Sequence, residues 1–135
     1  MDTPQPTGPS SQERALRVLL ADDNRDAVFL LARLLRAKGH EVCTAYDGQE
    51  ACQAAATFRP DVALLDIGMP RLNGYETARR LRQEPWGRDI LLVAITGWGQ
   101  DEDRRRSMEA GFDQHLLKPV DPKVLLHLLA GVPKN

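Results

Sequence analysis

The chain has 135 residues, of which 42% are hydrophobic and 27% are charged, and this composition fits one globular domain with a core of its own. A formal net charge of −1 excludes a global electrostatic field that would favour nucleic acid or an anionic membrane. No apolar run approaches the ~20 residues that span a bilayer, and the N-terminus lacks the pattern of a secretory signal. The two cysteines, Cys43 and Cys52, form neither a disulfide framework nor a ligand set, so we expect reduced thiols and a cytoplasmic location.

The character of the sequence changes near residue 14. Residues 1–13 contain three prolines among small polar residues and show no apolar periodicity, which predicts a disordered tail or linker. Residues 14–135 are expected to form the folded domain. Its first strand is predicted at Val18–Ala21, a short apolar run typical of a strand that is buried on both faces.

Strands and helices then alternate along the chain. A helix follows the first strand and ends near Gly39, with apolar residues at helical spacing: Ala27, Leu30, Leu31 and Leu34. The same alternation predicts strands at 41–45, 61–65, 90–95 and 115–117, and helices at 47–58, 75–82, 100–110 and 124–129. In the last helix the apolar residues that we expect to face the core are Val124, Leu125, Leu128 and Leu129.

Five strand–helix units in succession predict an α/β fold, a doubly wound five-stranded parallel sheet with five helices on both faces. The common strand order for five strands is 2-1-3-4-5, in which the crossover direction reverses between strands 1 and 3. Ligands of such sheets bind at the carboxyl ends of the strands beside this reversal. The residues at those strand ends are therefore the candidate site residues.

Polar residues follow the apolar runs at four strand ends. Asp22 and Asp23 come after the first strand, Asp66 after the third, Thr96 after the fourth and Lys118 after the fifth. Three clustered carboxylates repel one another and need a cation, and an all-oxygen site with room for a phosphate suits Mg²⁺. Lys118 offers an ammonium group and Thr96 a hydroxyl donor to phosphate oxygens. The set predicts a site that holds a phosphoryl group on a carboxylate.

Four motifs, in this order, resemble the receiver domains of two-component response regulators. They are Asp22-Asp23, the segment Leu64–Gly74 around Asp66, Ile95-Thr96-Gly97 and Leu117-Lys118-Pro119, and the resemblance extends from about Arg17 to Leu129. It implies a flavodoxin-like fold and a phosphorelay function, in which a sensor histidine kinase or a histidine phosphotransfer protein is the phosphodonor. It also implies a signalling domain rather than an enzyme, with at most slow self-dephosphorylation.

The resemblance assigns roles at the acceptor and the metal. Asp66 would be the phosphoacceptor and would attack a phosphohistidine of the partner. Asp23 would bind Mg²⁺, or another divalent cation such as Mn²⁺, directly, and Asp22 would help to hold it. Asp66 and the backbone carbonyl of Gly68 would complete the protein's ligand set.

The resemblance also implies a switch. Thr96 and Lys118 would contact the phosphoryl oxygens, and Pro119 would follow a cis peptide bond. On activation Thr96 would move towards the phosphoryl group, and the surface of the fourth helix, fifth strand and fifth helix would rearrange. The changed surface would then form a phosphorylation-dependent homodimer or dock to a downstream protein.

Two positions depart from the family's pattern. His115 stands three residues before Lys118, where the family often has Tyr or Phe as a rotating switch residue. It is either that switch, with a charge that would make switching pH-sensitive, or a plain surface residue. Trp98, two residues after Thr96, either shields the acyl phosphate from water or packs on the fourth helix.

Other functions fit the sequence less well. An aspartyl-phosphate phosphatase would need an Asp where the chain has Gly68, and a flavin or nucleotide module would need small residues where it has Asp22–Asp26. The basic run Arg104–Arg106 follows three acidic residues, which favours a solvated helix face over nucleic-acid binding. Two alternatives stay open: a docking scaffold that works without phosphorylation, and the receiver piece of a hybrid histidine kinase.

Overall fold

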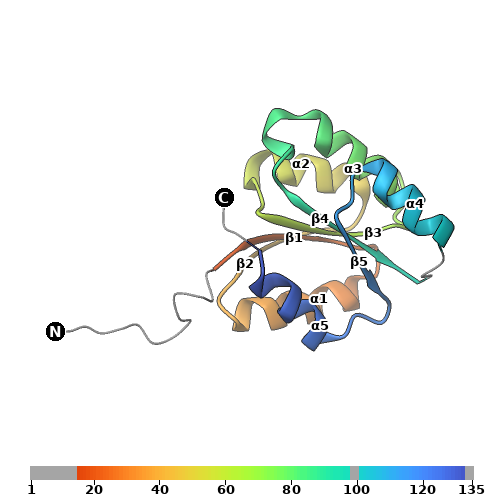
Figure 1. Cartoon of the computed structure of the whole chain (residues 1–135). Coiled ribbons are helices and arrows are strands. Elements are labelled where there is room, and N and C mark those ends of the chain that lie inside the picture. Colours follow the sequence, from red (N-terminus) through yellow and green to blue (C-terminus); the bar gives the residue numbers. More distant parts are fainter. Residues whose placement is uncertain (1–14, 98–100, 133–135) are drawn as a thin grey trace.

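The structure is a computed structural model that describes residues 15–97 and 101–132 of the chain, without the side chains of residues 101–103. Its strands are β1 (Arg17–Ala21), β2 (Glu41–Ala45), β3 (Val62–Asp66), β4 (Leu91–Thr96) and β5 (Gln114–Leu117) (Figure 1). Its α-helices are α1 (Arg25–Ala37), α2 (Gly48–Phe58), α3 (Gly74–Gln83), α4 (Asp101–Ala110) and α5 (Pro122–Ala130), with a short 3₁₀ turn η1 (Pro85–Gly87) after α3. Within these ranges no helix is both long and apolar enough to cross a membrane.

The strands form one parallel sheet in the order β2-β1-β3-β4-β5, which confirms the predicted order. The register brings the carboxyl ends of the central strands to one edge. Ala21 pairs with both Ala45 and Leu65, Asp66 pairs with Ile95, and Thr96 pairs with Leu117. The polar residues at or just after these strand ends are therefore neighbours.

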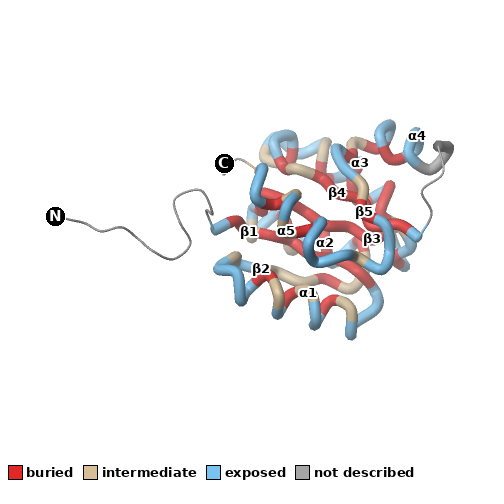
Figure 2. Tube along the Cα trace, turned by 60° about the horizontal axis from the view of Figure 1, so that its bottom comes forward, coloured by how far each residue is buried: buried red, intermediate tan, exposed pale blue. Residues whose placement is uncertain are grey.

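Helices cover both faces of the sheet. α2, α3 and α4 lie on one face, and α1 and α5 lie on the other (Figure 1). Successive residues of a strand point to opposite faces of the sheet and pack in one of two hydrophobic cores. The core on the side of α2 and α3 contains Leu19, Ala63 and Leu92, and the core on the side of α1 and α5 contains Leu20 and Leu64. Figure 2 shows this as central strands, β1, β3 and β4, that are buried almost throughout, with helices buried only along their inner sides. Burial on both faces explains why the strands read as continuous apolar runs.

Two of the site strands end one residue later than the sequence predicts. Asp66 and Thr96 are the last residues of β3 and β4, because each pairs with the neighbouring strand, Asp66 with Ile95 and Thr96 with Leu117. Both side chains are therefore fixed to the sheet rather than to a loop. At the opposite end, the carboxylate of Asp61 accepts a 2.8 Å hydrogen bond from the backbone N–H of Arg17.

Helix α1 begins after Asn24, whose side chain accepts a hydrogen bond from the backbone N–H of Ala27. Its buried residues are Val28, Ala32 and Leu35. Of the apolar residues that define the helix in the sequence, Ala27, Leu31 and Leu34 are half-buried and Leu30 is 66% exposed. The helix therefore carries two apolar faces.

The prediction for the last helix, α5, is correct only in part. Leu125 and Leu129 are buried, but Val124 is 51% exposed. The prediction that Val124 faces the core is wrong, because the buried stripe of α5 is narrower than its run of apolar residues.

Candidate functional site

Three carboxylates meet at the carboxyl edge of the sheet. Asp22 follows β1, and its backbone N–H donates to the carbonyl of Ala45 in β2, so it continues the sheet by one residue. Asp66 ends β3, and both residues are buried at 5% and 4% exposure, while Asp23 is exposed. One carboxylate oxygen from each of the three aspartates lies within 4.8 Å of the others. This is the cluster that the sequence predicts.

Lys118 balances part of this negative charge. Its Nζ lies 2.8 Å from Oδ1 of Asp66 and 3.8 Å from Oδ2 of Asp22. Its backbone N–H donates to the carbonyl of Thr96, and the next peptide bond, to Pro119, is cis, as expected from the resemblance. Partial burial acts to lower the pKa of Lys118, but the hydrogen bond and the charge of Asp66 outweigh it and raise the pKa. Lys118 is therefore held as a cation beside Asp66.

The surroundings of Asp22 disfavour its ionised form. Burial, together with the charge of Asp66, raises the pKa of Asp22 to about 6, even though the backbone N–H of Asn24 and the ammonium of Lys118 act to lower it. Ionising a buried carboxyl beside a second carboxylate is costly, and a bound cation would lower that cost. Three oxygen donors within 4.8 Å of one another, one of them exposed, fit a hard divalent cation that keeps part of its water shell.

The cluster opens into a cavity of about 470 Å³. Five of the seven predicted site residues line its wall, all except Asp22 and His115, together with four residues to which the sequence analysis gave no role at the site. The lining residues are Asp23, Asp66, Ile67, Gly68, Tyr75, Thr96, Gly97, Arg106 and Lys118. Gly68 and Gly97 leave room here: a Cβ at Gly68 would meet only Asp66 Oδ2 at 4.0 Å, and one at Gly97 would meet nothing within 4 Å.

Tyr75 and Arg106 are the residues that sequence reasoning missed. Tyr75 belongs to the first turn of α3 and Arg106 to α4, and neither falls in one of the four motifs. Their contact across two helices places both at the cavity, and no local pattern in the sequence predicts that contact. Arg106 was expected only on a solvated helix face.

His115 lies beside a second cavity, of about 360 Å³, which also contains Thr96 and Arg104. Within the part of the chain that the structure describes, the buried Nε2 of His115 has no hydrogen-bond partner. Burial, and then the charge of Arg104, lower the pKa of His115 and favour the neutral imidazole. The prediction for Trp98 falls on a residue outside the described ranges.

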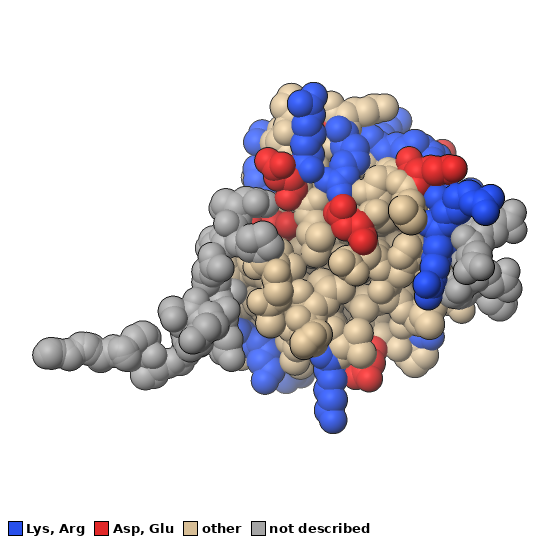
Figure 3. All heavy atoms as spheres, in the orientation of Figure 1, with Lys and Arg blue, Asp and Glu red and all other residues tan. Residues whose placement is uncertain are grey.

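This second cavity lies on the face formed by α4, β5 and α5, and its wall contains two charged residues, Arg104 and Asp121. Figure 3 shows Lys and Arg side chains along the upper side of the molecule and at its right edge, and a broad neutral surface between α4 and α5. Three large apolar side chains of α4, β5 and α5 are exposed: Met108, Leu117 and Val124. An uncharged surface that carries such residues is suited to a protein partner.

A third hollow lies on the other side of the cluster. It is a groove of about 640 Å³ between α1 and the segment that follows β5. The second apolar face of α1 forms one wall, with Leu30, Leu31 and Leu34, and Pro119 and Val120 form the other. Asp22 and Lys118 line its inner end, so the groove leads directly to the acidic cluster.

Known proteins match both the sequence and the fold. PrrA of Mycobacterium tuberculosis, a transcriptional regulatory protein, is 40% identical over 116 residues, which are 86% of this chain and 48% of PrrA. The chain thus spans about half the length of that relative. The chemotaxis protein CheY4 of Vibrio cholerae superposes with a TM-score of 0.84 at 29% identity, covering 89% of this chain and 100% of CheY4.

A second solved structure bears on the metal. The receiver domain of the sensor histidine kinase PA1611 of Pseudomonas aeruginosa, solved with a magnesium ion coordinated in its active site cleft, superposes with a TM-score of 0.79 at 30% identity. That match covers 86% of this chain and 95% of the other. The sequence model of the response regulator receiver domain matches residues 18–130. With its sheet order, its acidic cluster and these matches, the chain belongs to the response regulator receiver domain family.

Proposed function

We propose that this receiver domain accepts a phosphoryl group on Asp66 and so acts as the phosphoacceptor of a two-component pathway. The observation that carries the proposal is the position of the Asp66 carboxylate. It is buried at the end of β3, it opens into a cavity of about 470 Å³, and it has the Lys118 ammonium 2.8 Å away. A carboxylate held in this way is a nucleophile with a cation ready for the incoming phosphoryl group.

Asp66 and the residues around it have different roles in the phosphoryl transfer. A carboxylate oxygen of Asp66 attacks the phosphorus of a phosphohistidine; the new O–P bond forms as the N–P bond breaks, and the imidazole leaves. Lys118 neutralises one phosphoryl oxygen, and the hydroxyl of Thr96, at the same cavity wall, donates to another. Lys118 already lies 2.8 Å from Asp66, so its charge is in place before the transfer, whereas Thr96 completes its contact by moving towards the phosphoryl group.

Asp22, Asp23, Asp66 and the carbonyl of Gly68 would hold the Mg²⁺, or another divalent cation such as Mn²⁺. The cation would supply positive charge against the phosphoryl oxygens and would relieve the repulsion among the carboxylates. The raised pKa of Asp22, which comes first from burial and then from the charge of Asp66, is consistent with this part of the proposal, since a bound cation would favour the ionised carboxylate.

The groove beside α1 favours a helical protein as phosphodonor, and we assign this role to a sensor histidine kinase or a histidine phosphotransfer protein. Leu30 is 66% exposed and the neighbouring Phe29 59% exposed, so an apolar surface is available beside the acceptor. A partner that covers the groove would bring its histidine to the cluster at the groove's inner end. With a donor of this kind, we place the domain in the cytoplasm and assign it a signalling role. We also expect its self-dephosphorylation to be slow.

On the output side, Thr96 would move towards the phosphoryl group and His115 would follow it into the cavity that they share. The neutral face that carries Leu117 would then rearrange. Its ligand would be a second phosphorylated copy or a downstream protein. The scaffold alternative predicts the same surface but no dependence on Asp66, and the hybrid-kinase alternative differs only in how the domain is attached.

The decisive measurement is the intact mass after incubation with acetyl phosphate and Mg²⁺. One added phosphoryl group is expected, and it should be absent from Asp66→Asn and from a metal-free control. A folded wild-type domain that takes no phosphoryl group from either acetyl phosphate or a phosphohistidine protein would favour the scaffold.

The groove calls for a separate test. Leu30→Glu should slow transfer from a phosphohistidine protein at least tenfold, because it places a charge in an apolar contact. Phosphorylation by acetyl phosphate should not change, since the small donor does not need the groove. Equal slowing with both donors would mean that the substitution damages the site itself and that the groove is not the docking surface.

A further inference from the structure

Arg106 lies at the wall of the cavity that contains Asp66. Its guanidinium carbon is 4.4 Å from the centroid of the Tyr75 ring, a cation–π contact between α4 and α3. Tyr75 is only 5% exposed and belongs to the core on that face of the sheet. The ring is thus a fixed support, and it holds a planar cation at the cavity.

The backbone of α4 supports this placement. Ser107, the next residue, is 1% exposed, and Ala110 is 2% exposed and packs in the same core as Tyr75. Arg106 is itself exposed, so its N–H groups stay available to a ligand in the cavity. The helix is anchored beside Arg106, and the side chain lines the same cavity of about 470 Å³ as Asp66.

The charges of the site explain why a second cation is useful. A divalent cation and Lys118 together balance the three carboxylates of Asp22, Asp23 and Asp66. A phosphoryl group on Asp66 replaces one negative charge by two and leaves the site one positive charge short. Lys118 is a point charge already in contact with Asp66 at 2.8 Å, whereas a guanidinium can donate two parallel hydrogen bonds to phosphoryl oxygens.

We infer that Arg106 is a phosphoryl-binding residue of this domain, held by Tyr75 and directed at the outer oxygens of a phosphoryl group on Asp66. The inference rests on the proposed function, and it adds a specificity that the four motifs do not contain. Arg106 selects a doubly charged phosphoryl group over the bare carboxylate, so it contributes to retention of the phosphoryl group and little to binding of the metal. Tyr75 acts as a positioning residue.

The test measures the affinity for beryllofluoride, a phosphoryl mimic, at saturating Mg²⁺ by calorimetry. Arg106→Gln should weaken beryllofluoride binding about tenfold, which corresponds to about 1.4 kcal/mol. The affinity for Mg²⁺ alone should stay within twofold of wild type. Arg106→Lys should recover part of the lost affinity, because it keeps the charge.

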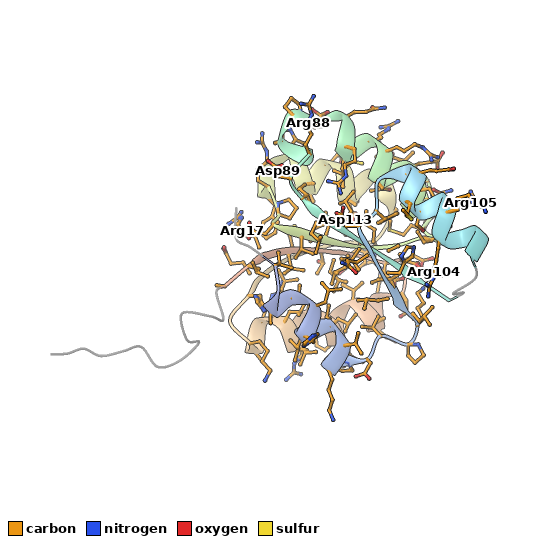
Figure 4. All side chains as sticks on the ribbon, in the orientation of Figure 1. Arg17, Arg88, Asp89, Arg104, Arg105 and Asp113 are labelled. Atoms are coloured by element: carbon orange, nitrogen blue, oxygen red, sulfur yellow. The ribbon has the colours of Figure 1, made fainter. Side chains whose placement is uncertain are left out.

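Arg105→Gln is the matched control. It removes the same charge from the adjacent position of the same helix, and Figure 4 shows Arg105 extending outward from α4, away from the sheet. It should bind beryllofluoride as wild type does. The assignment is overturned if the two glutamine variants bind the mimic equally well, or if Arg106→Lys recovers nothing.

The experiment distinguishes a failure of the proposed function from a failure of the role of Arg106 alone. A wild-type domain that binds neither beryllofluoride nor a phosphoryl group would refute the proposed function, and the role of Arg106 with it. A wild-type domain that binds both, together with an unaffected Arg106→Gln variant, would refute only the role of Arg106.

Discussion

Replacing Arg82 should destabilise the domain more than replacing any exposed arginine of the same helix. Arg82 lies in the last turn of α3 with its side chain 22% exposed, and its guanidinium ties α3 to two loops. It donates to four backbone carbonyls and one carboxylate: Gly87, Arg88, Ile90, Gly111 and Asp113. The shortest of these bonds to a carbonyl is 2.7 Å, to Ile90.

The cost follows from the carbonyls that would lose their donor. A hydrogen bond to a charged group contributes about 1.5–3 kcal/mol net, less where water can replace the donor. Ile90 is buried and Gly111 accepts two of the bonds, so we count these two sites at about 1.5 kcal/mol each and neglect the others. Arg82→Met should therefore lower the free energy of unfolding by about 3 kcal/mol, a large part of the roughly 5–15 kcal/mol of a typical domain.

Urea denaturation followed by circular dichroism measures this loss directly. Arg79→Met is the matched control, since Arg79 is exposed on the same helix, and it should change the free energy of unfolding by less than about 0.5 kcal/mol. The dependence on urea should keep its slope in both variants. If Arg82→Met loses less than about 1 kcal/mol relative to Arg79→Met, water satisfies the carbonyls and the reasoning is refuted.

Three further outcomes are expected. Burial lowers the pKa of His40 below 6.5, and its neutral Nδ1 accepts a hydrogen bond from the Leu16 N–H, so protonation is disfavoured in the folded state. The free energy of unfolding should therefore be highest above pH 6.5 and should fall as the pH drops below that value. The variant His40→Asn keeps a hydrogen-bond acceptor and should remove part of this pH dependence. An unchanged pH profile in this variant would contradict the assignment. Lys118→Met should slow phosphorylation by acetyl phosphate roughly 100-fold in the intact-mass assay, since it removes the cation 2.8 Å from Asp66, and a rate within threefold of wild type would exclude its role. Gly74→Ala should cost about 1–3 kcal/mol in urea denaturation, because its Cβ would lie 2.7 Å from the carbonyl oxygen of Asp66, and a neutral result would mean that the β3–α3 turn can shift.

The sequence was sufficient to predict the sheet order and the members of the acidic cluster. The reason is local: each buried strand is a short apolar run that ends at a polar residue, as β3 does at Asp66 and β4 at Thr96. Parallel strands then align those ends at one edge. Three strands end where predicted, but β3 and β4 each end one residue later, because their last residues pair with a neighbouring strand that is distant in the chain.

Contacts between helices could not be predicted from the sequence, for a different reason. Helix α1 has apolar residues over more than one side, so periodicity alone cannot tell that Val28 is buried and Leu30 is exposed. The answer depends on how the helix packs against the sheet. The same holds for Arg106, whose place at the cavity depends on the ring of Tyr75 in another helix.

The groove beside α1, the cavity of Asp66 and the cavity at His115 share lining residues, and these shared residues connect the proposed partner surfaces to the acidic cluster. Lys118 lines both the groove beside α1 and the cavity of Asp66, and Thr96 lines both that cavity and the one at His115. Under the proposed function, a phosphodonor in the groove would lie beside Lys118, which contacts Asp66, and a phosphoryl group on Asp66 would affect the α4–β5–α5 face through Thr96. Because different residues make the two connections, substitutions at Lys118 should impair phosphorylation, whereas substitutions at Thr96 should separate phosphorylation from the response of His115 and its surface.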